Sequence, residues 1–166
     1  MYIINLVDNS IQNSNMETTE DLTNNGYDLT QWSIASDSQV STYLFQQVVN
    51  KAYETNQANY DSKRNGVEVI NGVAINIDPI SCINITGQIL QIYVNKASGG
   101  SPLSVPWLDD SNLPHVYTED EFISLGQTVS YVIQQIQFKL SNNKIAIQNA
   151  TTMDDLNNID MNYSNF

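Results

Sequence analysis

The feature that most constrains the fold is a long helical pattern that follows Thr118. Thr118 and Glu121 have the spacing of a capping box, in which a hydroxyl and a carboxylate satisfy free backbone N–H groups at a helix start. Acidic residues throughout this first turn also suit the positive end of the helix dipole. The apolar positions recur every three or four residues, at Phe122, Leu125, Val129, Val132, Ile133, Ile136 and Leu140. This pattern predicts an amphipathic helix over Glu119–Asn149.

A second helical pattern occupies Gln39–Lys63. The segment Ser36-Asp37-Ser38 precedes it as an N-cap region, and Lys63-Arg64-Asn65-Gly66 supplies basic residues and a glycine at its end. The apolar residues recur in steps of four, at Val40, Leu44, Val48 and Ala52. The end of this helix is the expected boundary between two halves of the chain.

The strongest local signal in the sequence is a β-hairpin. Val67–Ile70 and Val73–Asp78 are rich in β-branched residues, and Asn71-Gly72 joins them. A two-residue type I′ turn requires positive φ at both positions, which asparagine and glycine tolerate. The other expected elements are a helix over Pro79–Lys96, a second hairpin from Val105–Leu108 and His115–Tyr117, a short helical turn opened by Thr152, and N-terminal strands over Tyr2–Val7 and Tyr27–Ile34.

These elements predict an α+β fold in which β-hairpins pack with two long amphipathic α-helices. Residues 1–65 are interpreted as an N-terminal attachment segment of short strands plus the helix over 39–63. Residues 66–160 are interpreted as an α+β domain, and residues 161–166 as a frayed tail.

The charge balance excludes several classes of partner. The chain has 18 Asp and Glu against 6 Lys and Arg, and its net charge is -12. It therefore lacks the basic patch that binds nucleic acid by releasing counterions, and it is repelled by anionic membranes. No segment approaches the roughly 18 apolar residues of a membrane span, and the first residues lack the pattern of a signal peptide. We expect no nucleic-acid partner, no membrane contact, no signal peptide and no transmembrane segment.

The residues that could carry chemistry do not form a recognisable site. Cys82 and His115 are each the sole residue of their type, so neither has a second thiol or imidazole with which to bind a metal. Asp109-Asp110 and Asp154-Asp155 are typical of a solvated turn and a helix cap rather than of paired catalytic carboxylates. We expect a protein that is not an enzyme, with no catalytic residues, no metal ligands and no cofactor.

The apolar face of the helix over Glu119–Asn149 is the candidate interaction surface. Its spacing is close to that of a coiled-coil seam, and glutamines flank it. In one interpretation the helix over Gln39–Lys63 covers this face within a monomer. In the other, part of the face binds another chain, either in a homo-oligomer or in a larger assembly. The partner-interface candidates are Leu125, Val129, Val132, Ile136, Leu140 and Trp107. For Trp107, packing in the core and stacking on a sugar are the alternatives.

An ordered set of features over Gly66–Ile159 resembles a family of phage and prophage proteins. The features are the hairpin over Val67–Asp78, the tryptophan and polar turn at Trp107–Asn112, the cap at Thr118–Glu121, the sequence Ser-Tyr-Val within Val129–Val132, and the ending Ile147–Leu156. The family is domain of unknown function 4376, whose members sit among tail-fibre and tail-fibre-assembly proteins. Its members commonly carry arginines in the helix after the hairpin, where this chain has none. The family has no established catalytic residues to carry over.

The resemblance implies a non-enzymatic, tail-associated protein of a bacteriophage or prophage, an interaction module that mounts the tail fibre or baseplate or assists its assembly. Residues 66–160 would be the tail-associated domain, and the partner a tail fibre or baseplate protein, or a second copy of the chain. The expected location is the virion tail, or the host cytoplasm during assembly. The alternative, from another class, is a small glycan-binding or glycan-cleaving accessory domain of a tail receptor-binding apparatus.

Overall fold

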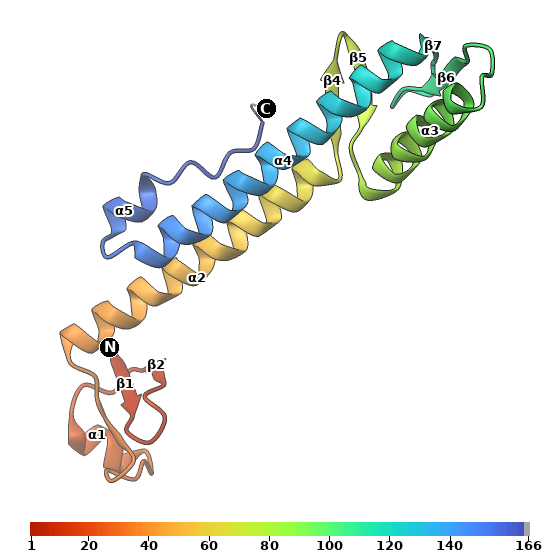
Figure 1. The fold of residues 1–166 in the computed structure, drawn as a ribbon. Coiled ribbons are helices and arrows are strands. Elements are labelled where there is room, and N and C mark those ends of the chain that lie inside the picture. The colour runs from red at the N-terminus through yellow and green to blue at the C-terminus, as the bar shows by residue number, and fades with distance from the viewer. Residues whose placement is uncertain (165–166) are drawn as a thin grey trace.

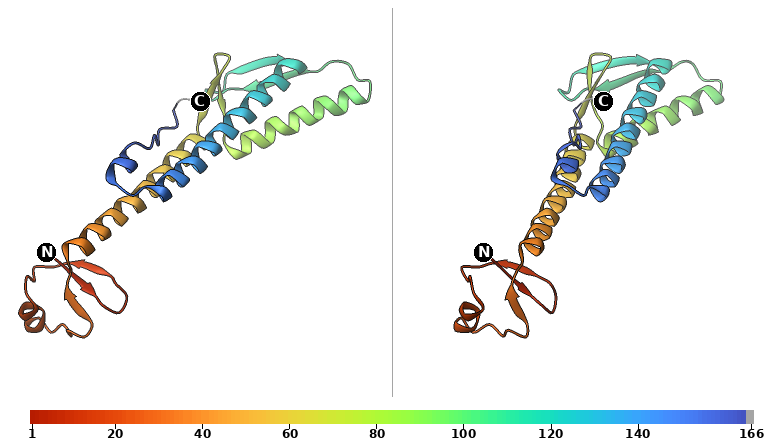
Figure 2. Two further views of the ribbon diagram at one scale, coloured as in Figure 1. Left: turned by 60° about the vertical axis from the view of Figure 1, so that its left-hand side comes forward. Right: turned by 90° about the vertical axis from the view of Figure 1, so that its left-hand side faces the viewer.

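A computed structural model describes residues 1–164 of the chain. The molecule is elongated, with a small sheet at one end, two long antiparallel helices in the middle, and a head of two hairpins and a third helix at the other end (Figure 1 and Figure 2). This arrangement confirms the α+β fold that the sequence predicts.

The N-terminal end is a three-stranded antiparallel sheet with strand order β2-β1-β3. Its elements are β1 (Tyr2–Asn5), β2 (Ile11–Asn13), helix α1 (Thr19–Asn24) and β3 (Trp32–Ile34). The strands expected over Tyr2–Val7 and Tyr27–Ile34 form in shortened versions, as β1 and β3. The sequence analysis missed β2 and α1, because Ile11 in β2 and Leu22 in α1 are single buried residues within polar segments.

Two long helices form the middle of the molecule, α2 (Asp37–Arg64) and α4 (Glu119–Asn149). Ser36 caps α2 and Thr118 caps α4, each in a capping box with a side chain three residues further on. The bounds of α4 are those predicted, and α2 extends slightly beyond the predicted Gln39–Lys63 at both ends.

The two long helices lie antiparallel and side by side (Figure 1 and Figure 2). The buried residues of α2 include Val49, Ala52 and Asn56, in the part of the helix that faces α4. Val49 and Ala52 pack in one apolar cluster with Ile147 of α4 and with Leu156, which follows α4. The first turns of α2 extend beyond α4 and reach the N-terminal sheet, so this helix connects the sheet to the rest of the molecule.

A polar cluster is buried at the contact between α2 and α4. Asn143 of α4 donates its side-chain N–H groups to Asn56 of α2 at 3.0 Å and to the carbonyl of Asp160 at 2.9 Å. The hydroxyl of Tyr163 donates to the same oxygen of Asn56 at 2.8 Å. The amide of Asn56 in turn donates to the carbonyl of Leu140 at 3.4 Å. Two helices and the C-terminal segment therefore meet at one fully buried side chain, Asn56.

The head consists of β4 (Val67–Ile70), β5 (Val73–Asn76), α3 (Pro79–Ala97), β6 (Ser104–Leu108) and β7 (Pro114–Thr118). Each hairpin is its own two-stranded antiparallel sheet. At the first turn, Asn71 has φ 52° and Gly72 has φ 81°, which confirms the predicted type I′ connection. The backbone N–H of Asp110 donates to the carbonyl of Ala74 at 2.9 Å and links the two hairpins.

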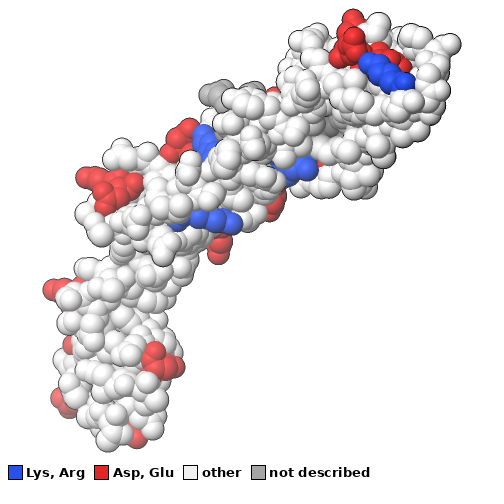
Figure 3. Space-filling view, in the orientation of Figure 1, with Lys and Arg blue, Asp and Glu red and all other residues white. Residues whose placement is uncertain are grey.

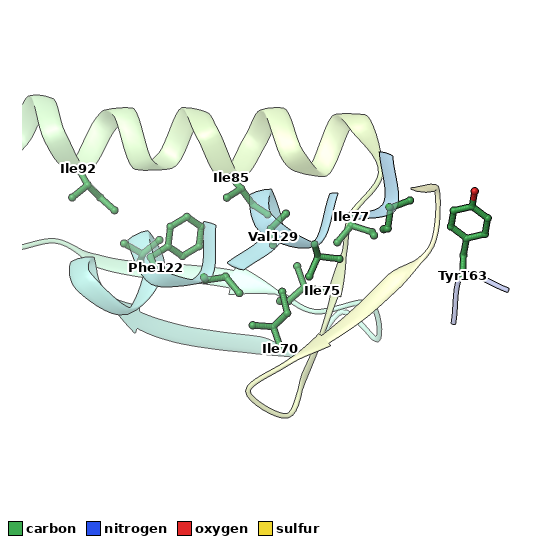
Figure 4. Packing of buried hydrophobic residues seen from close by; sticks show 12 residues of the cluster. Ile70, Ile75, Ile77, Ile85, Ile92, Phe122, Val129 and Tyr163 are labelled. Carbon is green, nitrogen blue, oxygen red and sulfur yellow. The ribbon is translucent and has the colours of Figure 1, made fainter. Parts of the chain in front are cut away.

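The main core lies where α3, α4 and the hairpins meet. Ile85 of α3 points toward Val129 of α4, and Ile75 and Ile77 enter from the first hairpin (Figure 4). Phe122, at the start of α4, is completely buried in the same cluster.

The chain after α4 forms α5 (Met153–Asn157) and then runs back along the helix pair. The capping box of Thr152 with Asp155 opens α5, as the sequence predicts. The segment expected to fray is placed against the core as far as the structure describes it, and Tyr163 is buried there. Residues 165 and 166, to which that expectation also applies, lie outside the described residues.

The first prediction concerns the Asn71-Gly72 turn. Replacing Gly72 with Val places a β-branched residue at positive φ, and we expect a loss of about 1–2 kcal/mol in the free energy of unfolding. The measurement is chemical denaturation. Gly72→Asn is the control, because asparagine tolerates the left-handed region, and it should retain most of the stability. Equal stability of the Val variant and the parent would contradict a turn with positive φ at residue 72.

The second prediction concerns the buried cluster around Asn56. Asn56→Ala removes the acceptor of the Asn143 amide and should lower the free energy of unfolding by about 2 kcal/mol. Asn50→Ala is the matched control, because Asn50 is an exposed residue of the same helix, and its effect should stay within about 0.5 kcal/mol. If the two variants unfold at the same denaturant concentration, the cluster does not contribute to stability as described.

Candidate interaction surface

Helix α3 starts at a strong cap and crosses α4 at a glycine. The side chain of Asp78 accepts hydrogen bonds from the backbone N–H groups of Ile80 at 2.8 Å and Ser81 at 3.1 Å. Gly126 of α4 allows the close approach of α3, because a Cβ atom there would lie 2.3 Å from Cδ1 of Ile89. A side chain at Gly126 would push α3 away from the core.

The inner face of α3 belongs to the main core. Ile85 and Ile92 are buried and point toward α4 (Figure 4), and Ile89 is partly buried beside them. These positions recur at intervals of three and four, as expected for one face of a helix.

The outer face of α3 is also apolar, and it is exposed. We call this set of residues the α3 stripe, which consists of Ile80, Ile83, Gly87, Leu90 and Val94. The exposed fraction of the four large side chains runs from 58% at Val94 to 70% at Ile80 and Ile83. Their spacing of three, four, three and four residues is that of a coiled-coil seam. The α3 stripe therefore has the pattern of a contact surface and faces solvent.

The α3 stripe carries no charge, in a chain whose net charge is -12. No Asp, Glu, Lys or Arg occurs between Pro79 and Asn95, and the residues beside the stripe include Asn84 and Gln91. Figure 3 shows the surface over α3 as largely free of charged side chains. Because contiguous apolar patches of this kind on soluble proteins mark interaction sites, the α3 stripe is the candidate functional site.

The structure corrects the interface predicted from the sequence. Four of the six candidates are buried inside this chain: Leu125, Val129, Val132 and Ile136. The exposed fraction of Ile136 is 0%, and that of Val132, the highest of the four, is 8%. Helices α2 and α3 and the first hairpin cover this side of α4, so these residues present no surface to a partner.

The other two candidates are partly buried at the edge of the same core. Leu140 packs against the core cluster from α4. The ring of Trp107 packs on that of Phe122, with centroids 5.4 Å apart, which is the core-packing alternative for this residue.

The exposed apolar residues of α4 lie on the side opposite its buried seam. They are Tyr131, Phe138 and Ile145, spaced seven residues apart. Gln134 and Ser141 stand where a coiled-coil seam would have its second row of apolar residues. This side of α4 is therefore a single row, in contrast to the α3 stripe.

The sequence analysis missed the α3 stripe because α3 is apolar on two sides. Ile83, Ile85, Ile89 and Ile92 appear as one helical run in the sequence, although Ile83 faces solvent and the other three face the core. The detectable signal was the second, interleaved set of apolar positions, which a single amphipathic face does not require.

Asp109 organises the turn of the second hairpin. It accepts from the backbone N–H groups of Ser111 at 2.9 Å and Leu113 at 2.8 Å, and its other oxygen lies 3.0 Å from Nε2 of His115. The hydrogen bond with His115, followed by that with Leu113, lowers the pKa of Asp109 from its ordinary value. These bonds give the Asp109–His115 pair a structural role within the turn.

The other residues considered as catalytic groups or metal ligands also make local structural contacts. Cys82 is partly buried in α3, its thiol lies 3.3 Å from the carbonyl of Ile77, and burial raises its pKa. Asp155 closes the cap of α5 beside Asp154, as the sequence predicts. Within residues 1–164, no cluster of three or more His, Cys, Asp or Glu side chains could hold a metal ion. None of the helices described has both the length and the apolar character to cross a membrane.

Comparison with known proteins gives one match. Residues 46–161 match the family model described as Domain of unknown function (DUF4376), which confirms the resemblance noted in the sequence. The resemblance noted in the sequence began at Gly66, whereas the match begins earlier, inside α2. This earlier start agrees with the packing of the later part of α2 against α4. No curated protein and no solved structure matches the chain.

The third prediction concerns the pH dependence of stability at Asp109. Its pKa is lower in the folded than in the unfolded chain, so the carboxylate stabilises the fold above the unfolded value of about 3.9 and this contribution is lost as the pH falls below it. Asp109→Asn should lower the melting temperature at pH 7, and the difference from the parent should shrink by about pH 3. Asp110→Asn, which changes the exposed neighbouring residue, is the control. A deficit of the Asp109 variant that is the same at both pH values would contradict this role.

Proposed function

The chain belongs to the family described as Domain of unknown function (DUF4376), and we propose that it is a non-enzymatic interaction module of a bacteriophage or prophage tail. In this role it mounts the tail fibre or baseplate, or assists its assembly. The observation that carries the proposal is the α3 stripe, an exposed and uncharged apolar surface on an otherwise acidic molecule.

The exposure of the α3 stripe supports binding to another protein. Burying one Leu, Ile or Val side chain is worth about 1.5–3 kcal/mol, so covering the four large residues of the stripe offers a substantial driving force for association. Because the stripe has no charged groups, a partner can cover it without the free-energy cost of desolvating a charge. An apolar partner surface therefore suits it better than a charged one.

The shape of the molecule supports a mounting role. The α3 stripe lies in the head, and the long helices separate it from the N-terminal sheet (Figure 1). The family match covers the head, α4 and the part of α2 from residue 46 onward, but not residues 1–45. In our proposal the N-terminal sheet attaches to one component and the head to another.

The assignment to a phage tail rests on the resemblance of the sequence to tail-associated proteins, and the exposed α3 stripe supports a binding role. The partner in this proposal is a tail fibre or baseplate protein. The location is the virion tail, or the host cytoplasm for a protein that leaves after assembly.

The fourth prediction tests this function in purified phage or prophage particles. Mass spectrometry of the particles and of assembly intermediates should find the parent chain together with tail fibre or baseplate proteins. Leu90→Glu should reduce this association at least tenfold, because it places a charge in the α3 stripe. Tyr131→Glu is the matched control, since Leu90 and Tyr131 are both 62% exposed and on helices.

Two results would contradict the proposal. One is the absence of the parent chain from both particles and intermediates. The other is turnover of host surface polysaccharide by the purified chain, which would favour the alternative of a glycan-cleaving accessory domain.

A further inference from the structure

We propose that the α3 stripe binds the α3 stripe of a second copy of this chain, in a two-fold symmetric dimer whose α3 helices cross antiparallel at Gly87. This inference rests on the proposed function and narrows it: the chain that covers the α3 stripe is a second copy, and the tail fibre or baseplate protein then binds the dimer at another surface. Three observations carry it: the symmetry of the stripe about Gly87, the open space in front of that glycine, and the absence of charge.

The stripe is nearly symmetric about its centre. Ile80 and Val94 each lie seven residues from Gly87, Ile83 lies four residues before it and Leu90 three residues after it. At a rise of 1.5 Å per residue, an antiparallel crossing at Gly87 sets Ile80 opposite Val94 of the other copy, both about 10 Å from the centre. It also sets Ile83 beside Leu90 of the other copy, because these residues lie about 6 Å and about 4.5 Å along the helix axis from the centre. A two-fold interface requires this self-complementarity, and a contact with an unrelated chain does not.

Gly87 has the property that helix crossing requires. The chain already uses a glycine of this kind at Gly126, where the side chain of Ile89 from α3 packs directly over the glycine. A Cβ atom at Gly87, by contrast, would meet no heavy atom within 4 Å among the described residues. Glycine within a helix is unfavourable for stability, and nothing in the packing of this chain demands it at that position. In the dimer, Gly87 lets the two helix backbones approach each other.

The charge distribution allows a second copy to approach at this surface. Two chains of net charge -12 repel each other, and α3 offers an uncharged surface where they can approach. Lys96, near the end of α3, is turned to α4, where its ammonium group lies 3.4 Å from Glu119 and 3.0 Å from Asp120. Antiparallel helices also place the positive end of each dipole beside the negative end of the other.

The first test is the mass of the protein in solution over a range of concentrations, by light scattering. The parent should change from one to two copies as its concentration rises, because a single-helix contact lies at the small end of specific interfaces. Leu90→Glu should remain a monomer, and the control Tyr131→Glu should dimerise like the parent. A parent that stays monomeric at every concentration overturns the inference, and so does a Leu90→Glu variant that still dimerises.

The second test examines the antiparallel crossing of the two α3 helices by disulfide formation. Each variant also carries Cys82→Ser, which removes the native cysteine. The double variant Ile83→Cys/Leu90→Cys leaves Gly87 in place, sets the thiols of the two copies beside each other and should form a covalent dimer on oxidation. Ile80→Cys is the control, because it lies about 20 Å from its own counterpart in an antiparallel crossing and should not cross-link. A covalent dimer of Ile80→Cys, or none of Ile83→Cys/Leu90→Cys, contradicts the antiparallel crossing.

The two proposals can fail separately. A chain that stays monomeric in solution but enters tail particles through the α3 stripe refutes the dimer and leaves the proposed function standing. A chain that dimerises through α3 but associates with no tail protein refutes the proposed function and leaves the dimer.

Discussion

The antiparallel contact between α2 and α4 determines where the head lies, and the buried amides of Asn56 and Asn143 fix its register. An apolar seam alone tolerates a shift by one helical turn, because one aliphatic contact resembles the next. Buried donors and acceptors, in contrast, must be paired, and here they pair in one alignment. Tyr163 bonds to the same side chain, so the C-terminal segment depends on this contact too. Since β4 follows α2 and β7 precedes α4, the alignment of the helices also positions both hairpins.

This scaffold supports α3 from one side. Gly126 brings α3 close to α4, and Ile85, Ile89 and Ile92 fill the space between them. The remaining apolar residues of α3 then face outward. A helix that is apolar on two sides is typical of one that lies between two layers of protein, and this chain supplies one of those layers. The second layer is what we assign to another copy of the chain, and the lack of charge on α3 is consistent with that contact.

The elements with repeated or strongly local signals could be predicted from the sequence. The capping box at Thr118 with its apolar period defined α4, and Asn71-Gly72 defined the first hairpin. The segments β2 and α1 could not be predicted in this way, because one buried residue in each gives no period. Four of the six predicted interface residues are buried in the chain, because periodicity identifies an apolar face but not the element that covers it. The face of α4 is covered within the chain, whereas the outer face of α3 is not.

The most direct test of this account is the rate at which a thiol reagent modifies a single cysteine on each face. Val94→Cys and Val129→Cys, each in a Cys82→Ser background, are near-isosteric changes on the exposed α3 stripe and the buried seam of α4. We expect Val94→Cys to react rapidly at low protein concentration and more slowly as the concentration rises, because a second copy covers it. We expect Val129→Cys to remain unreactive in the folded protein at every concentration. A rate at Val94→Cys that does not depend on protein concentration, or equal reactivity of the two variants, would contradict the account.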